Sequence, residues 1–337
     1  MIPLDDIAAS NARIASAFPA GLVGLFVGAT SGIGAGTLKA FAKHASRPRA
    51  YFVGRSRTAA DAILADCKAL NPEGEYIFIQ ADVSLIRVVD EVCDQIKAKE
   101  SALNILFLTQ GVPSLDRTLT SENLHLLTAL VSYSRLRFMS NLLPLIEKAT
   151  GLRRIVTVGA GGFEGPIDAT DISALHTPPE QVRGHIASLM TLGLEAVSRR
   201  ASGVTLIHAY PGAVDTPLAR QLLTAGYEAP IKIPTPEDWL SPEESGERNL
   251  FLLTSSRYYA RSAGGADLLV SVTSDLGLVT GVDGEPGSGV YSVGVDGESA
   301  SAEAIEFIAR LRKEGLVEKV WAHTQGEFER ITGANDV

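Results

Sequence analysis

Short apolar runs rich in β-branched residues alternate along the chain with longer segments of helical periodicity. The runs that predict strands are LVGLFVGA (22–29), RAYFVG (49–54), YIFIQAD (76–82), ALNILFLTQG (102–111), RRIVTVGAG (153–161) and GVTLIHAYPG (203–212). The segments that predict the intervening helices are 34–44, 58–70, 85–100, 121–149 and 179–201. Strands that alternate with helices indicate βαβ units. We therefore predict an α/β protein with a doubly wound parallel sheet and helices on both faces.

The rest of the chain extends this pattern without marking a second domain. Residues 1–20 predict an amphipathic lead-in helix, and 21–337 a single Rossmann-like domain. Within it, 213–288 is rich in Pro, Gly and Ser, with one helix over 242–256, and is typical of a substrate loop or lid. Residues 289–337 should supply a last strand, within GSGVYSVGVDGESAS (287–301), and two helices over 302–314 and 317–328.

Composition narrows the classes of partner. A formal net charge of −9 argues against a nucleic-acid or anionic-membrane surface. No apolar run approaches the roughly 20 residues that a membrane span needs. Asp5 and Asp6 stand where a secretory signal would carry basic residues. We expect a cytoplasmic protein whose partner is a small molecule, with a homodimer left open.

The two cysteines do not suggest a metal or disulfide site. Cys67 and Cys93 both fall in predicted helices, and their separation does not match a C-x-x-C motif. We therefore expect no bound metal and a reducing compartment.

A glycine-rich turn follows the first predicted strand. In GATSGIG, the glycines Gly28, Gly32 and Gly34 allow close backbone approach and leave helix N–H groups free for a pyrophosphate; a tight turn alone would also explain them. VGRSR (53–57), ADV (81–83) and YPGAVDTP (210–217) follow the second, third and sixth strands. With this spacing and order, the chain resembles the short-chain dehydrogenase/reductase superfamily.

The resemblance implies a set of cofactor contacts. It places Asp82 and Val83 at the adenine, and Pro211, Gly212 and Thr216 beside the nicotinamide. The full expected set is Gly28, Thr30, Ser31, Gly32, Ile33, Gly34, Arg55, Ser56, Arg57, Asp82, Val83, Gln110, Gly111, Pro211, Gly212 and Thr216. The family's NNAG after the fourth strand reads LTQG here (108–111), so that only the glycine is retained.

The end of the second strand bears on the choice of cofactor. An acid there would accept hydrogen bonds from a ribose 2′-OH, whereas cations accommodate a 2′-phosphate. The chain has Arg55, Ser56 and Arg57 and no acid among them. This favours NADP(H) over NAD(H). The alternative is that the two arginines form a solvated surface pair.

The family's Asn-Ser-Tyr-Lys catalytic pattern is missing. Ala160 takes the place of the Ser, Val131 or Ser132 that of the Asn, and His185 and Leu189 those of the Tyr and the Lys. No Tyr occurs between residues 133 and 210 and no Lys between 148 and 232, so no shift of register restores the pair.

Four residues remain as candidate proton donors. His185 is either an acid or a core histidine, since its unperturbed pKa is near 6.5. His208 and Tyr210 should share one face of the sixth strand, at the edge where doubly wound sheets bind ligands. Tyr133 is either a proton donor or a core aromatic.

Two arginines in SYSRLRF (132–138) have a plainer expectation. Arg135 and Arg137 should lie on a solvated helix face, with pairing to an acidic substrate as the alternative.

Three functions remain open. The first is an NADP(H)-binding oxidoreductase that acts on a hydrophobic small molecule with an altered proton donor. The second is a redox-neutral isomerase, dehydratase or cyclase on the same fold. The third is a non-catalytic NADP(H)-binding protein. The runs GTLKAFAK (36–43), HAYPG (208–212) and VWAHT (320–324) are similar to fungal members associated with secondary metabolism.

Overall fold

The core of the protein is a single parallel sheet. The computed structural model describes residues 1–112, 116–224, 235–260, 269–271 and 276–333. Its seven strands lie in the order β3-β2-β1-β4-β5-β6-β7, and each neighbouring pair is parallel. The strands are β1 Val23–Val27, β2 Arg49–Gly54, β3 Glu75–Gln80, β4 Ile105–Leu108, β5 Arg154–Val158, β6 Thr205–Ala209 and β7 Val290–Val293. The predicted fold class is confirmed, because every predicted strand is found and all join one sheet.

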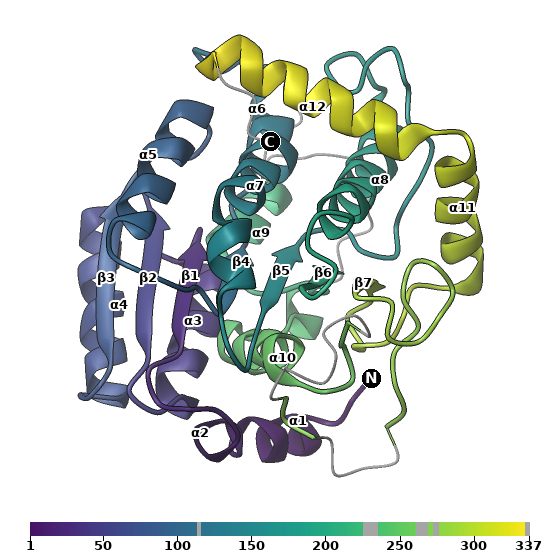
Figure 1. Ribbon diagram of the computed structural model, residues 1–337. Coiled ribbons are helices and arrows are strands. Elements are labelled where there is room, and N and C mark those ends of the chain that lie inside the picture. Colours follow the sequence, from purple (N-terminus) through teal and green to yellow (C-terminus); the bar gives the residue numbers. More distant parts are fainter. Residues whose placement is uncertain (113–115, 225–234, 261–268, 272–275, 334–337) are drawn as a thin grey trace.

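Helices cover both faces of the sheet (Figure 1). One face carries α5 Ile86–Lys97, α7 Ser134–Glu147 and α8 Pro179–Ser198, and the other carries α3 Gly32–His44, α4 Arg57–Leu70 and α10 Pro242–Thr254. The remaining elements are α1 Leu4–Asn11, α2 Ile14–Ala17, α6 Leu126–Thr128, the π-helix η1 Ala129–Tyr133, α9 Pro217–Thr224, the 3₁₀-helix η2 Pro236–Asp238, α11 Ala302–Lys313 and α12 Leu316–Thr332. Alternate strand residues therefore enter two separate apolar cores.

Two N-terminal and loop features differ from the sequence prediction. The lead-in segment is two helices rather than one, because the chain turns after α1 at Asn11, whose amide donates to the carboxylate of Glu247 on α10 over 2.7 Å. Helix α9 was not predicted. Leu218, Leu222 and Leu223 give it an apolar side, but it has only eight residues and lies within the segment whose Pro, Gly and Ser content predicted a loop.

The predicted helix over 121–149 begins later and is not regular. It starts at Leu126 and passes through the π-helix η1 before α7. A π-turn inserts an extra residue, which rotates every following side chain by about 100° relative to a continuous α-helix. The expectation that Arg135 and Arg137 are solvated is wrong, because they are only 3% and 2% exposed.

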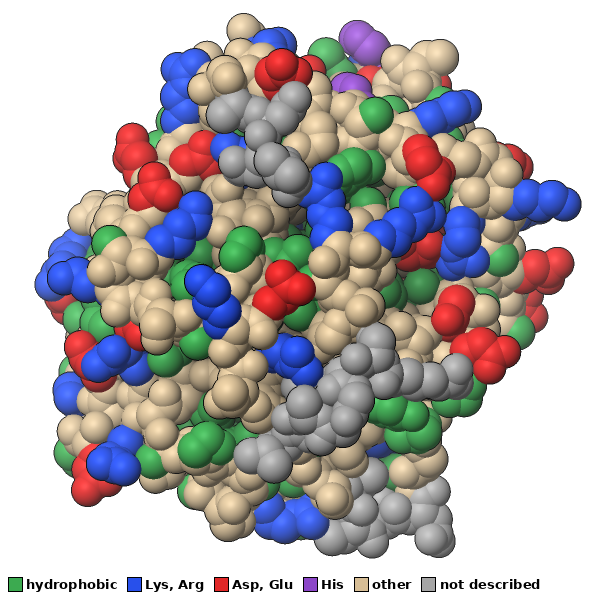
Figure 2. Space-filling view, in the orientation of Figure 1, with side chains coloured by type: hydrophobic (Ala, Val, Ile, Leu, Met, Phe, Trp, Pro, Cys, Tyr) green, Lys and Arg blue, Asp and Glu red, His purple; other side chains and the backbone are tan. Residues whose placement is uncertain are grey.

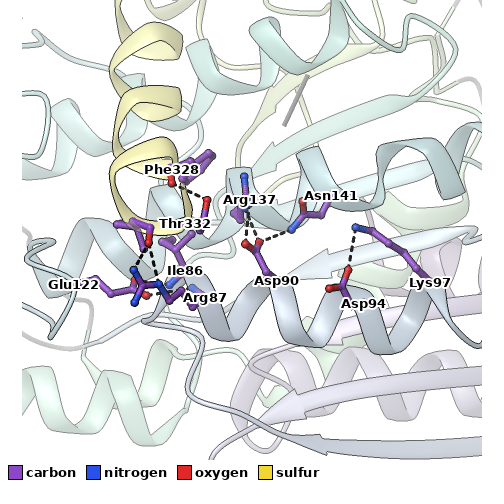
Figure 3. Close-up of polar contacts among 11 residues, drawn as sticks. Ile86, Arg87, Asp90, Asp94, Lys97, Glu122, Arg137, Asn141, Phe328 and Thr332 are labelled. Carbon is purple, nitrogen blue, oxygen red and sulfur yellow. Dashed lines mark hydrogen bonds and ion pairs between the residues drawn. The ribbon is translucent and has the colours of Figure 1, made fainter. Parts of the chain in front are cut away.

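Arg137 instead joins the helices of one face to the C-terminal helix. It donates from Nε and Nη2 to the carboxylate of Asp90 on α5, over 2.6 and 2.7 Å (Figure 3). Its guanidinium also lies 5.1 Å from the ring centroid of Phe328 on α12. Arg87 of α5 donates to the carbonyl of Ile331 over 2.9 Å. These contacts fix α12 across α5 and α7 (Figures 1 and 3).

The surface is mixed in charge. On the face drawn in Figure 2, basic and acidic side chains are interspersed. Among the described residues, no helix is long and apolar enough to cross a membrane. Cys67 and Cys93 are both buried and unpaired thiols, as their positions in helices predicted.

Candidate functional site

The turn between β1 and α3 is built from glycines for a structural reason. Gly28 has φ +80°, and a Cβ atom on it would lie 2.8 Å from the backbone nitrogen of Gln110. A Cβ on Gly34 would lie 2.5 Å from the carbonyl oxygen of Gly28. Helix α3 begins at Gly32, so the N–H groups of its first turn lack acceptors within the helix. The turn therefore has the shape and the donors of a phosphate site.

The ends of β2 and β6 close around this turn. A Cβ on Gly32 would lie 2.8 Å from Cγ2 of Thr216, at the start of α9. Thr30 packs against Gly54 at the end of β2. A Cβ on Gly54 would lie 2.5 Å from Cγ2 of Thr30. Ser31 is the N-cap residue of α3 but makes no side-chain capping bond, and Ile33 follows Gly32 in the first turn. The structure thus brings the glycine turn and Thr216 together.

The three residues after β2 have different environments. Ser56 caps α4 by accepting a hydrogen bond from the amide of Ala59 over 3.2 Å. Arg57 pairs with Asp61 one turn along α4, over 2.9 Å. Arg55 is exposed, and its backbone carbonyl accepts a 3.0 Å hydrogen bond from the side-chain amide of Gln80, but no described residue forms an ion pair or hydrogen bond with its guanidinium. Of the two arginines, Arg55 is therefore the one whose guanidinium is available to a ligand phosphate.

The remaining predicted cofactor residues line the same edge of the sheet. Asp82 accepts a hydrogen bond from the amide of Ser84 over 3.1 Å, and Val83 beside it is buried. Gln110 follows β4 and donates to Ser134 over 3.1 Å. The next residue, Gly111, is open, because a Cβ there would find its nearest neighbour at 3.8 Å.

Pro211 and Gly212 continue this edge after β6. Gly212 has φ +74°, which L side chains rarely adopt, so the chain turns here towards Thr216 and α9. The structure therefore places these two residues between the carboxyl end of β6 and the glycine turn.

His185 is fully enclosed by the long loop before α8. Its Nε2 donates to the carbonyl of Ile172 over 3.2 Å, and its Nδ1 accepts from the amide of Asp168 over 3.4 Å. Asp171 folds this loop over the helix by accepting the backbone amide hydrogen bonds of His176 and Thr177, both over 2.7 Å. Burial lowers the pKa of His185. Because both ring nitrogens are engaged, His185 has no free donor for a substrate in this structure.

Tyr133 is also enclosed in the core, against the C-terminal helix. Its hydroxyl lies 2.8 Å from Nε2 of His323 on α12, and its ring is 1% exposed. Burial raises the pKa of Tyr133. The contact places this tyrosine in the core beneath the C-terminal helix.

His208 and Tyr210 share one face of β6, as alternation predicts. Both side chains meet residues of α8 or of the loop after β5. His208 Nε2 accepts a 3.1 Å hydrogen bond from the amide of Ala160, and its Nδ1 lies 2.9 Å from Oγ1 of Thr191. His208 is therefore placed to fix the residue that stands where the family has its serine.

A buried glutamate completes the network behind His208. Glu164 Oε1 accepts from Thr191 Oγ1 over 2.7 Å and from Ser292 Oγ over 2.6 Å. Burial raises the pKa of Glu164, but its contact with His208 and the hydrogen bonds from Ser292 and Thr191 outweigh burial and lower it. The partners assign the protons: Thr191 donates to the carboxylate, and His208 donates from Nδ1 to Thr191. Thr191 thus links the two side chains, because its hydroxyl donates to Glu164 and accepts from Nδ1 of His208.

Arg135 places a buried cation under the ends of β4 and β5. Its Nη1 donates to Thr157 Oγ1 over 2.7 Å and to the Val158 carbonyl over 2.6 Å, and its Nη2 donates to the Gln110 carbonyl over 2.6 Å. All three acceptors are neutral. Burial lowers the pKa of Arg135 to about 9, which still leaves the guanidinium charged at neutral pH. Arg135 thus contributes a buried positive charge near this edge from α7.

Unpaired polar atoms collect at the same edge. Gln110 Oε1 and Arg135 Nε, beside the ends of β4 and β5, are buried and have no hydrogen-bond partner among the described residues. Buried polar atoms are normally satisfied by protein, water or ligand. Together with the glycine turn, they make the carboxyl edge of β1, β4 and β5 a fitting site for a dinucleotide, the place where doubly wound sheets bind one.

Three side chains form the outer wall of the site. The ring of Phe163, in the loop after β5, meets the ring of Tyr210 edge-on with centroids 4.8 Å apart. The Arg183 guanidinium carbon lies 3.4 Å from the Phe163 centroid and 5.1 Å from that of Tyr210. The Tyr210 hydroxyl makes no hydrogen bond with any residue in the described part of the chain.

Sequence reasoning missed Glu164, Thr191, Ser292 and the inward orientation of Arg135. Glu164 lies in a loop and Ser292 in the last strand, and no local pattern connects them. One sequence feature is related to this network. Gly159, next to Ala160, leaves room for His208, because a Cβ on Gly159 would lie 2.7 Å from Nε2 of His208.

Comparisons with known proteins identify the family and the fold. The family model for short chain dehydrogenases matches residues 23–166. The chain is 37% identical to "Oxidoreductase AN1596" of Emericella nidulans, over 98% of this chain and 99% of the relative. It is 36% identical to the "NmrA-like family domain-containing oxidoreductase notO" of Aspergillus sp. (strain MF297-2), over 97% of this chain and 95% of the relative. The solved structure of YwfH, described as an NADPH-dependent reductase involved in bacilysin biosynthesis, has a similar fold, with a TM-score of 0.56 at 15% identity over 70% of this chain and 92% of that one.

Proposed function

Because the chain belongs to the short-chain dehydrogenase/reductase superfamily, we propose that it is an NADP(H)-dependent oxidoreductase of hydrophobic carbonyl compounds. The observation that carries the proposal is the glycine turn from Gly28 to Gly34, closed by Thr216. Two relatives that match over at least 95% of their length are both named as oxidoreductases, which supports the reaction class.

The preference for the 2′-phosphorylated cofactor rests on Arg55. Its guanidinium is exposed and lacks a described partner at the end of β2, where the adenosine ribose is expected. Arg57 is less available because Asp61 already holds it at 2.9 Å. YwfH, which shares the fold, is described as NADPH-dependent, in keeping with this choice.

Tyr210 is the proton donor that the geometry favours. His185 has both nitrogens bound to backbone groups, and Tyr133 is bound to His323. His208 is held between Ala160 and Thr191. Tyr210 is partly exposed, retains a free hydroxyl among the described residues and directly precedes the Pro-Gly turn expected beside the nicotinamide.

A bound NADPH would supply the hydride for the carbonyl carbon. As the carbonyl oxygen gains charge, the Tyr210 hydroxyl gives it a proton, and the tyrosinate recovers one from water. The buried Arg135 cation contributes a favourable potential for the developing negative charge. His208 and Glu164 keep the Ala160 loop in place, so that the substrate oxygen meets a fixed surface.

Leu189 favours a redox-neutral reaction as the second candidate. It is 2% exposed in the core, at the position where the family places the lysine that assists hydride transfer. An isomerase, dehydratase or cyclase would use the same pocket for positioning and proton transfer without consuming cofactor.

Isotope transfer separates the two candidates. The protein is incubated with NADPH deuterated at the reactive C4 position and a panel of hydrophobic ketones and enones, and the products are analysed by mass spectrometry. The proposal expects one deuterium in each product molecule and one NADPH oxidised. A converted product without deuterium, formed with no loss of NADPH, would establish the redox-neutral reaction instead.

A further inference from the structure

The outer wall of the site contains an arginine whose only described contacts are aromatic rings. Arg183 belongs to the second turn of α8, and its guanidinium carbon lies 3.4 Å from the centroid of Phe163. A cation this close to the centroid lies over the face of the ring. Tyr210 contacts the same pair from the end of β6.

This stacking leaves the hydrogen-bonding edge of the guanidinium free. An arginine that packs its face on a ring keeps its N–H donors directed outwards in the guanidinium plane. No described carboxylate or carbonyl accepts from Arg183, although ion pairs are frequent elsewhere in the protein. Phe163 is 41% exposed, so apolar surface borders the free donors.

We propose that Arg183, Phe163 and Tyr210 form a substrate subsite for a carboxylate attached to an apolar, unsaturated body. The carboxylate takes two parallel N–H donors of Arg183, a geometry that matches the guanidinium fork. The apolar body lies against the exposed ring of Phe163. This inference rests on the proposed function, because it assigns the substrate class of the site in which Tyr210 gives the proton.

The surroundings favour an organic acid over a phosphate. Two aromatic rings border the single cation, so an anion with an apolar body can pair with the guanidinium and pack against the rings. A phosphate monoester is more strongly charged and is usually held by several donors, as at the glycine turn on the other side of the site. The carboxylate therefore distinguishes this subsite from the cofactor's phosphate sites.

The test compares an acid with its neutral isostere. The protein is first saturated with NADP⁺, and the dissociation constants of benzoate and benzamide are measured by saturation-transfer NMR. We expect benzoate to bind at least about tenfold more tightly, equivalent to about 1.4 kcal/mol. Arg183→Met should abolish that difference, and Arg183→Lys should retain part of it.

Arg200 offers a matched control. It lies just after the same helix, with its guanidinium carbon 4.8 Å from the Trp321 ring, and so repeats the cation–aromatic contact away from the site. Arg200→Met should leave the preference for benzoate unchanged. Phe163→Leu should weaken both probes while Arg183 keeps the preference for the acid.

Two outcomes would overturn the inference. One is an equal preference for benzoate in the parent and in folded Arg183→Met. The other is a loss of NADP⁺ affinity in Arg183→Met as large as the loss for benzoate, which would assign the arginine to the cofactor. Failure of the parent protein to bind NADP⁺ refutes the proposed function, whereas NADP⁺ binding without any benzoate preference refutes the subsite alone.

Discussion

The amide nitrogen of Ala160 donates a 3.1 Å hydrogen bond to Nε2 of His208. The sequence predicts that Ala160 takes the place of the family's catalytic serine, and His208 is 2% exposed on the neighbouring strand. Because Nε2 accepts this bond, His208 positions the loop after β5 and does not itself give a proton to the substrate.

Replacing His208 should separate positioning from packing. His208→Leu removes the acceptor of the Ala160 amide and should lower kcat by about 10²-fold, the usual cost of a small misplacement at a reacting centre. His208→Gln can accept from Ala160 and donate to Thr191, and should recover most of the rate. Steady-state kinetics of both variants provide the comparison, and equal losses in the two would mean that the network does not position the loop.

Tyr210→Phe tests the proton donor. The substitution keeps the ring that packs on Phe163 and removes only the hydroxyl, so the fold should be retained while kcat falls by 10²- to 10⁴-fold. Steady-state kinetics measure the rate, and circular dichroism checks that the variant is folded. A rate within about threefold of the parent would exclude Tyr210 as the donor.

Gly111→Ala tests where the cofactor lies. A Cβ at this residue would come no closer than 3.8 Å to its protein neighbours, so the free energy of unfolding should change by less than about 1 kcal/mol. If the nicotinamide half lies against this glycine, the dissociation constant for NADPH should rise at least about tenfold. Fluorescence titration and urea unfolding measure the two effects. An unchanged affinity for NADPH in the folded variant would show that the cofactor does not lie against Gly111 at the end of β4.

His185 should affect stability and its dependence on pH. Burial lowers the pKa of His185 in the folded protein. The unfolded chain therefore binds a proton at His185 near pH 6.5, whereas the folded protein binds it only at a lower pH. The contribution of His185 to stability is therefore complete above about pH 6.5 and is lost as the pH falls through that value towards the folded pKa. His185→Phe should cost about 1 to 3 kcal/mol at pH 8, through two lost hydrogen bonds, and should reduce the difference in stability between pH 8 and pH 5.

Chemical unfolding at both pH values measures this dependence. His323, whose pKa burial also lowers, remains in the variant and accounts for residual pH dependence. The activity of folded His185→Phe should stay within threefold of the parent. A larger loss of activity without any change in stability would restore His185 as a candidate acid.

The sheet and the glycine turn after β1 could be predicted from the sequence because both depend on local patterns. Buried parallel strands are continuous apolar runs, and the turn at Gly28 needs positive φ and close backbone contact. The catalytic side depends on long-range contacts instead. A π-turn directed Arg135 inwards, and the loop organised by Asp171 enclosed His185. Neither event has a short-range signal.

The affinity of the protein for NADPH and NADH is the most direct test of the account. Calorimetric titration of the parent, Arg55→Ala and Arg57→Ala with each cofactor compares the unpaired arginine with the one that Asp61 already holds. We predict that the parent binds NADPH at least about tenfold more tightly than NADH, and that Arg55→Ala removes most of this preference, while Arg57→Ala has a smaller effect. Absence of binding to either nucleotide, or an NADPH preference unchanged in Arg55→Ala, would contradict the account.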